Sequence, residues 1–164
     1  MRLAAFNAMP EADARLAVEP CLAVPRWVDE LVGARPYPAL ADLLQYADRS
    51  AGRLSPQEVA AALAAHPRIG ERPPGSTTTA ALSRSEQSGV SPDPDVAERL
   101  RAGNAAYERR FGRVFLIRAA GRTGEEILGE LDRRLGNDPQ AELAEVADQL
   151  REIAVLRLEQ LVRP

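Results

Sequence analysis

The sequence predicts an all-α protein, a single-domain helical bundle of about seven to nine helices. Apolar residues recur at intervals of three and four positions along most of the chain, and strand-like alternation of polar and apolar residues is nearly absent. Prolines separate the helical stretches, which keeps the predicted helices short. Because 164 residues is an ordinary size for one globular domain, we expect residues 1–164 to form a single domain.

In the first half, the pattern predicts helices at about residues 10–20, 25–34, 38–48 and 55–65. The last of these opens with Ser55-Pro56-Gln57-Glu58. This is a capping box, in which the serine and glutamate side chains satisfy backbone N–H groups, and it places proline at the first helical position. His66-Pro67 ends the same helix, because proline disfavours helical backbone in the residue before it.

The second half predicts three longer helices. The first runs from Pro94 to Arg110 and stops at Phe111-Gly112, where glycine is a typical C-cap. Thr123-Gly124-Glu125-Glu126 is a second capping box, and the helix that it opens ends near Gly136. Asp138-Pro139 then begins the last and longest helix.

Apolar residues of the last helix fall close to one stripe, as expected for a helix packed into a core. The stripe consists of Leu143, Val146, Leu150, Ile153, Leu156, Arg157 and Leu161. Arg157 therefore stands where leucine is the ordinary choice. Three arginines (118, 122 and 157) lie nearest to apolar runs and could form internal ion pairs, whereas those at 109, 110, 133 and 134 are expected on solvated helix faces.

Two segments depart from the helical pattern. Residues 68–91 are rich in glycine, proline, serine and threonine, and we expect a long irregular loop with only a short helical turn. Val114-Phe115-Leu116-Ile117 is either a short extended piece or the start of a buried helix.

Composition excludes several kinds of chemistry. All 21 basic residues are arginine, and without lysine the chain cannot form a Schiff base or anchor pyridoxal phosphate. One histidine and one cysteine cannot supply the ligands of a zinc site. Composition leaves an all-carboxylate site for a hard cation open, but we expect no metal. A net charge of −3 without long runs of one sign argues against nucleic acid as a partner.

The chain ends and the apolar runs indicate where in the cell the protein is located. The apolar stretch after Met1-Arg2 is too short for a signal peptide, and the longest apolar run, Val59 to Ala65, is far too short to cross a bilayer. The lone Cys21 allows no intrachain disulfide. We therefore expect no membrane association and a cytoplasmic location.

His66 is the first candidate for chemistry, since it is fixed at a helix C-terminus, where the carbonyl dipoles favour the protonated ring and raise its pKa. The alternative is that the imidazole only caps the helix. Glu86 also has two possible roles. Ser83-Arg84-Ser85-Glu86 matches a capping box, in which the carboxylate would bind a backbone N–H group. Alternatively, the carboxylate takes part in catalysis. The amide of Gln87 and the backbone donors at this helix start could hold an anionic ligand.

Several short motifs occur in an order that resembles the OHCU decarboxylase family. They are Phe6-Asn7, Trp27, Arg35-Pro36, His66-Pro67-Arg68-Ile69-Gly70, Ser83-Arg84-Ser85-Glu86-Gln87, Asn104-Ala105-Ala106-Tyr107, Phe111-Gly112-Arg113-Val114-Phe115, Arg133-Arg134-Leu135-Gly136-Asn137 and Leu156-Arg157-Leu158. The resemblance implies a cofactor-independent enzyme, commonly a homodimer. Its substrate would be 2-oxo-4-hydroxy-4-carboxy-5-ureidoimidazoline (OHCU), which is decarboxylated to (S)-allantoin in uric acid degradation.

The resemblance also implies roles for individual residues. His66 matches the catalytic histidine and Glu86 its partner carboxylate. The positions that match substrate-binding residues are Pro67, Ser83, Gln87, Ile117, Arg118, Ala119 and Arg157. The chain departs from the pattern at Ala120, where many members have arginine, and this departure supports the alternative of an inactive helical binding module of the same fold.

Overall fold

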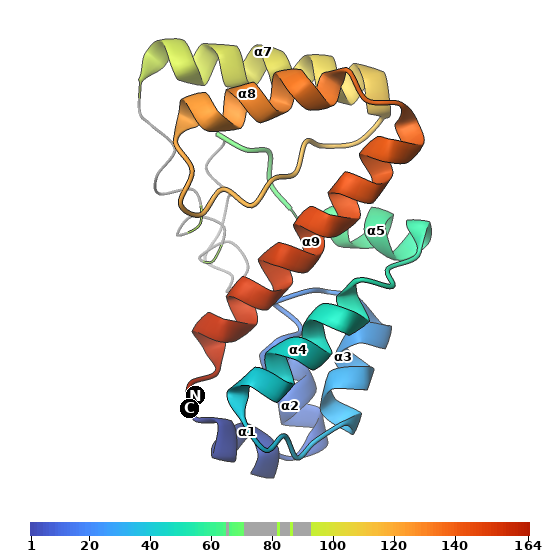
Figure 1. The fold of residues 1–164 in the computed structure, drawn as a ribbon, viewed down its shortest axis with the longest axis vertical. Coiled ribbons are helices and arrows are strands. Elements are labelled where there is room, and N and C mark those ends of the chain that lie inside the picture. The colour runs from blue at the N-terminus through green and yellow to red at the C-terminus, as the bar shows by residue number, and fades with distance from the viewer. Residues whose placement is uncertain (65, 71–81, 83–85, 87–92) are drawn as a thin grey trace. The chain divides into compact units, whose positions relative to one another are not determined.

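The computed structural model describes residues 1–64, 66–70, 82, 86 and 93–164, and within these ranges all regular structure is helical (Figure 1). The described residues contain eight helices: α1 (Leu3–Ala8), α2 (Glu11–Val18), α3 (Pro25–Gly33), α4 (Leu40–Ala51), α5 (Pro56–Leu63), α7 (Pro94–Phe111), α8 (Gly124–Leu135) and α9 (Pro139–Leu161). The predicted all-α class is confirmed.

Helix α1 is the one described helix that the sequence did not predict. It has only six residues, too few for an apolar period to emerge. A tertiary contact stabilises its end, because Arg35 Nη1 donates to the carbonyl oxygens of Phe6 (2.6 Å) and Met9 (2.8 Å). The other seven begin and end within a few residues of the predicted bounds.

The chain divides into two compact units. The first comprises residues 1–62 and 150–164, and the second comprises residues 63–149. The chain passes from the second unit back into the first inside α9, which continues without a break through residue 150.

In the first unit, helices α1 to α4 surround a core that includes Trp27, which is fully buried. Its indole Nε1 donates to Ala47 O at 3.1 Å and so joins α3 to α4. The two chain ends lie side by side (Figure 1), because Leu3 N donates to Arg163 O at 2.7 Å and Arg163 N donates to Met1 O at 2.8 Å.

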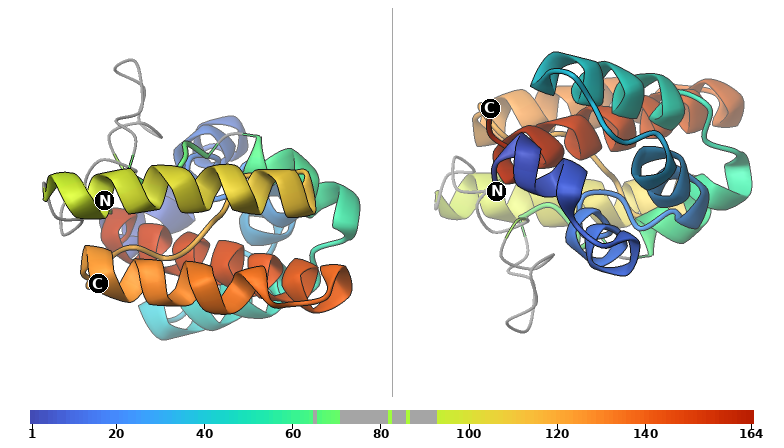
Figure 2. Two further views of the ribbon diagram at one scale, coloured as in Figure 1. Left: turned by 90° about the horizontal axis from the view of Figure 1, so that it is seen from above. Right: turned by 90° about the horizontal axis from the view of Figure 1, so that it is seen from below.

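In the second unit, α7 and α8 lie side by side (Figure 2). The two helices approach so closely that a Cβ atom on Gly103 would lie 2.3 Å from Leu131 Cδ2. Any larger residue at position 103 would therefore require the buried Leu131 side chain to shift. The connection between these helices buries Phe115 and Ile117 and contains no helix. Of the two alternatives for Val114–Ile117, the start of a buried helix is wrong.

The caps predicted at Ser55, Thr123 and Gly112 are confirmed. Ser55 N donates to Glu58 Oε2 (2.8 Å) and Glu58 N donates to Ser55 Oγ (3.2 Å). Thr123 and Glu126 form the same reciprocal pair at the start of α8. Gly112 ends α7 in the left-handed region, with φ of 66°, which glycine adopts without strain.

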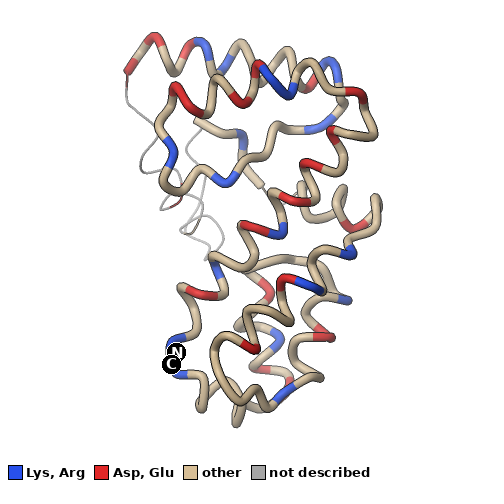
Figure 3. The backbone as a smooth tube through the Cα atoms, viewed as in Figure 1, with Lys and Arg blue, Asp and Glu red and all other residues tan. Residues whose placement is uncertain are grey.

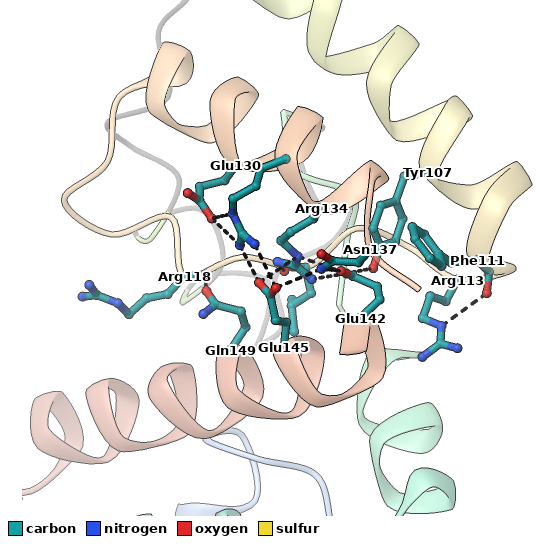
Figure 4. A network of polar contacts seen from close by, with 12 residues as sticks. Tyr107, Phe111, Arg113, Arg118, Glu130, Arg134, Asn137, Glu142, Glu145 and Gln149 are labelled. Atoms are coloured by element: carbon teal, nitrogen blue, oxygen red, sulfur yellow. Dashed lines mark hydrogen bonds and ion pairs between the residues drawn. The ribbon is translucent and has the colours of Figure 1, made fainter. Parts of the chain in front are cut away.

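The expectation that Arg134 lies on a solvated face is wrong. Its side chain is 1% exposed and pairs with Glu142, which is fully buried (Figure 4). Arg134 Nε and Nη2 both donate to Glu142 Oε1, at 3.0 and 2.5 Å. The helical spacing from Ile127 through Leu131 to Arg134 puts all three on the buried stripe of α8. The apolar period therefore predicts the burial of Arg134 better than the charge of its neighbours does.

The other three arginines expected on solvated faces are exposed, as predicted: Arg109, Arg110 and Arg133. Arg133 pairs with Glu130 (2.9 Å) and Glu145 (2.5 Å). Its hydrogen bond lowers the pKa of Glu145 to about 2. Figure 3 shows acidic and basic residues interspersed along α7 and α8, as is typical of solvated helix faces.

Most of the predicted loop at 68–91 lies outside the described residues. Of that range, residues 68–70 are described, and Leu82 and Glu86 have helical backbone. No helix in the described part of the chain is long and apolar enough to cross a membrane.

We expect Arg134→Met to destabilise the protein by about 3–5 kcal/mol, because it leaves the Glu142 carboxylate buried without its cation. Arg133→Met is the matched control: the neighbouring arginine forms exposed pairs, whose loss typically costs about 0–1 kcal/mol. Urea unfolding followed by circular dichroism measures both free energies of unfolding. Equal losses in the two variants would contradict the role assigned to the buried pair.

Candidate functional site

His66 and Pro67 lie directly after α5, as predicted. The helix ends at Leu63, and His66 N donates to Leu63 O at 3.0 Å. The imidazole is half-buried, and its Nε2 atom is shielded from water. The ring is therefore carried by a short non-helical segment whose start is tied to the end of α5.

The segment that follows, residues 68–70, contacts α7. Arg68 forms two hydrogen bonds with Glu108, from Nε to Oε1 and from Nη2 to Oε2 (2.9 Å). Asn104 Nδ2 donates to Ile69 O at 2.9 Å. The hydrogen bonds from Arg68 lower the pKa of Glu108, which favours the ionised carboxylate in this pair.

A cleft of about 560 Å³ lies between this segment and α7. Its volume is in the usual range for small-molecule sites. It is lined by Arg68, Ile69, Gly70, Pro94, Ala97, Glu98, Leu100, Arg101, Asn104, Ala105 and Glu108. The residues that follow His66-Pro67 thus border a space of ligand size.

Glu86 is half-buried and has helical backbone within the second unit. Ser83 and Gln87, the other two candidates of this motif, lie outside the described residues, and so does the predicted capping interaction of Ser83.

Residues 117–119 belong to the non-helical connection between α7 and α8 (Figure 4). Side chains from two helices hold this connection by its main chain. Arg134 Nη1 donates to Leu116 O at 2.7 Å, and the Arg118 backbone N–H donates to Gln149 Oε1 at 2.8 Å. Ile117 and Ala119 are buried, and Arg118 is half-buried.

Sequence reasoning did not predict Gln149 or Asn104 as contacts of candidate segments. Both contacts go to main-chain atoms more than 30 residues away in sequence. The one sequence feature that pointed to either residue was the Asn104-Ala105-Ala106-Tyr107 motif. It contributed to the family resemblance, but the resemblance implied no role for the asparagine.

Arg157 is 1% exposed, which confirms that it lies on the buried stripe of α9. It belongs to the first unit, where its Nη1 donates to Pro20 O at 3.2 Å. His66, Pro67, Glu86 and residues 117–119 all belong to the second unit.

These groups offer acid–base chemistry from an imidazole and a carboxylate, together with guanidinium and backbone donors for an anionic or polar ligand. Among the described residues, no group of three or more histidine, cysteine, aspartate or glutamate side chains could hold a metal ion.

The comparisons with curated proteins point to one family. A family model described as OHCU decarboxylase matches residues 7–159. The "Uric acid degradation bifunctional protein TTL" of Arabidopsis thaliana is 36% identical over 104 residues, covering 61% of this chain and 32% of that protein. The 2-oxo-4-hydroxy-4-carboxy-5-ureidoimidazoline decarboxylase of Mus musculus is 32% identical over 131 residues, covering 78% of this chain and 74% of that protein.

The overlap in length differs among these relatives. The chain spans about a third of the Arabidopsis protein and about half of a decarboxylase from Amia calva that is 34% identical over 90 residues, or 54% of this chain.

A solved structure has the same fold. It is described as "Crystal structure of OHCU decarboxylase in the presence of (S)-allantoin", and it matches with a TM-score of 0.70 and 23% identity over 87% of this chain and 94% of that one. The fold agrees with the family model, which covers nearly the whole sequence, and this chain therefore belongs to the OHCU decarboxylase family.

Proposed function

We propose that this protein decarboxylates OHCU to (S)-allantoin in uric acid degradation, without a cofactor. The observation that carries the proposal is the placement of His66: it follows the end of α5, its Nε2 is shielded from water, and it comes two residues before Arg68–Gly70, which border a cleft of about 560 Å³. Membership of the family and the activity for which the mouse relative is named support this substrate.

In this proposal His66 is the catalytic histidine and Glu86 is its partner. A carboxylate near an imidazole fixes its tautomer and stabilises its charged form. Pro67, Ser83 and Gln87 contact the substrate, as do Ile117, Arg118 and Ala119. Arg157 helps to hold the substrate through its guanidinium.

The chemistry needs few protein groups. The bond between the ring carbon and the carboxylate breaks, carbon dioxide leaves, and the electron pair passes into the conjugated ring of the substrate. The hydroxyl on that carbon loses its proton and becomes the carbonyl oxygen, and a proton adds to one face of the neighbouring ring carbon, which carries the ureido group. The protein contributes orientation, hydrogen-bond donors and proton transfer.

The test generates OHCU in situ from urate with urate oxidase and hydroxyisourate hydrolase, and follows allantoin chirality by circular dichroism. We expect rapid and exclusive formation of the (S) signal. His66→Asn should lower the rate on the order of 10²-fold or more, as is typical for loss of a general acid–base group. The thermal midpoint of each variant serves as the control for folding.

A slow racemic background that the wild-type protein leaves unchanged would reject the activity, and it would favour the inactive binding module. Turnover by His66→Asn at the wild-type rate would support the decarboxylase activity but exclude His66 from the reaction.

We further propose that the two compact units unfold together as one domain. In support, the chain crosses between them inside α9, whereas domain boundaries usually fall in exposed linkers. Trp27 is the only tryptophan of the chain and lies in the first unit, whereas Arg134 lies in the second. Arg134→Met should therefore lower the urea midpoint of Trp27 fluorescence as much as that of circular dichroism. A shift in circular dichroism alone would show two independent units.

We also propose a homodimer and a cytoplasmic location. The resemblance to the family supports the homodimer, and the exposed Leu16 side chain on α2, at 68%, offers an apolar contact. The single cysteine supports a reducing compartment. Sedimentation equilibrium should give twice the chain mass of 17.8 kDa, and a mass of one chain across the micromolar range would reject the homodimer.

A further inference from the structure

One face of α7 contacts the three residues that follow His66-Pro67. Leu100, Asn104 and Glu108 are spaced four residues apart, and residues at this spacing share a helix face. Leu100 packs against Gly70, where a Cβ atom would lie 3.6 Å from Leu100 Cδ1.

The two polar residues of this face form directional contacts. Asn104 is 4% exposed, and its Nδ2 donates to Ile69 O at 2.9 Å. Glu108 accepts two hydrogen bonds from the Arg68 guanidinium. Paired contacts of this kind fix the orientation of both groups as well as their separation.

These contacts leave the segment little freedom. His66 N is bonded to Leu63 O on the α5 side, and proline fixes φ at residue 67. On the other side, Ile69 O and the Arg68 side chain are held by α7. His66 therefore lies between two fixed points, three residues before it and two to three residues after it.

We propose that Asn104 and Glu108 are positioning residues, which set the orientation of the His66 imidazole by holding residues 68 and 69 against α7. The inference rests on the proposed function for the role of His66 in turnover. The predicted effect on the imidazole itself can be measured without substrate.

The Arg68–Glu108 pair suits a test because it is partly exposed, with 46% and 27% of the two side chains accessible. Exposed ion pairs contribute little to stability, so Glu108→Ala should fold normally. Asp95→Ala is the matched control: it removes the same charge from the same helix at a residue that does not line the cleft, and it breaks the pair of Asp95 with Arg99, which does not involve residues 66–70.

The first measurement is the proton NMR spectrum of the imidazole. His66 is the only histidine, so its Hε1 resonance needs no assignment. We expect Glu108→Ala to shift and broaden this resonance, while Asp95→Ala leaves it as in the wild type. An unchanged resonance in Glu108→Ala would overturn the proposal.

The second measurement is turnover of OHCU generated in situ. We expect Glu108→Ala to lower kcat on the order of tenfold, since small misplacements of a catalytic group have effects of this size. KM should change by less than about twofold, because an interaction made only in the transition state leaves KM unaffected. A wild-type kcat for Glu108→Ala, or an equal loss in Asp95→Ala, would overturn the proposal.

Asn104→Leu gives a second test of the same contact, since it keeps the size of the side chain and removes the donor to Ile69 O. We expect the same change in the His66 resonance. If this buried substitution prevents folding, the comparison of Glu108→Ala with Asp95→Ala still tests the proposal. If the wild-type protein shows no turnover, the proposed function fails while the NMR comparison still tests the positioning.

Discussion

The buried ion pair between Arg134 and Glu142 ties together most of the second unit. It joins α8 to α9, and Glu142 also accepts a hydrogen bond from Tyr107 on α7. Arg134 reaches the α7–α8 connection through Leu116 O and lies over the Phe115 ring, 4.7 Å from its centroid. Removing two charges from water is costly unless each meets several partners. The network supplies those partners, and it thereby holds α7, α8, the start of α9 and the α7–α8 connection in one arrangement.

This constraint matters because the candidate functional segments are not helical. A non-helical backbone lacks the internal hydrogen bonds of a helix, and its buried polar groups need partners from elsewhere. Helix side chains supply them: Asn104 bonds to Ile69 O after His66, while Arg134 and Gln149 bond to Leu116 O and Arg118 N. The rigid helices thereby set the geometry of the segments that carry the proposed chemistry.

The sequence predicted what depends on local chemistry. Capping boxes and glycine C-caps placed the starts and ends of helices, and the apolar period placed Arg157 in the core. The prediction failed for Arg134, because the cluster of charged residues around it suggested an exposed face although the apolar period placed it on the buried one. Contacts such as Gln149 with Arg118 N could not be predicted, because they join a side chain to a main-chain atom 31 residues away, and no residue type at position 118 encodes them.

Contacts to the main chain also bear on Ala120, the position where the chain departs from many family members. Arg134 and Gln149 bind Leu116 O and Arg118 N, and Ala119 O accepts from Arg122 N at 3.0 Å. None of these contacts involves the side chain of residue 120. Replacing arginine by alanine there leaves the main chain of 116–119 held as before. The departure at Ala120 therefore concerns only the contacts that an arginine side chain would make there, and not the contacts that hold residues 116–119.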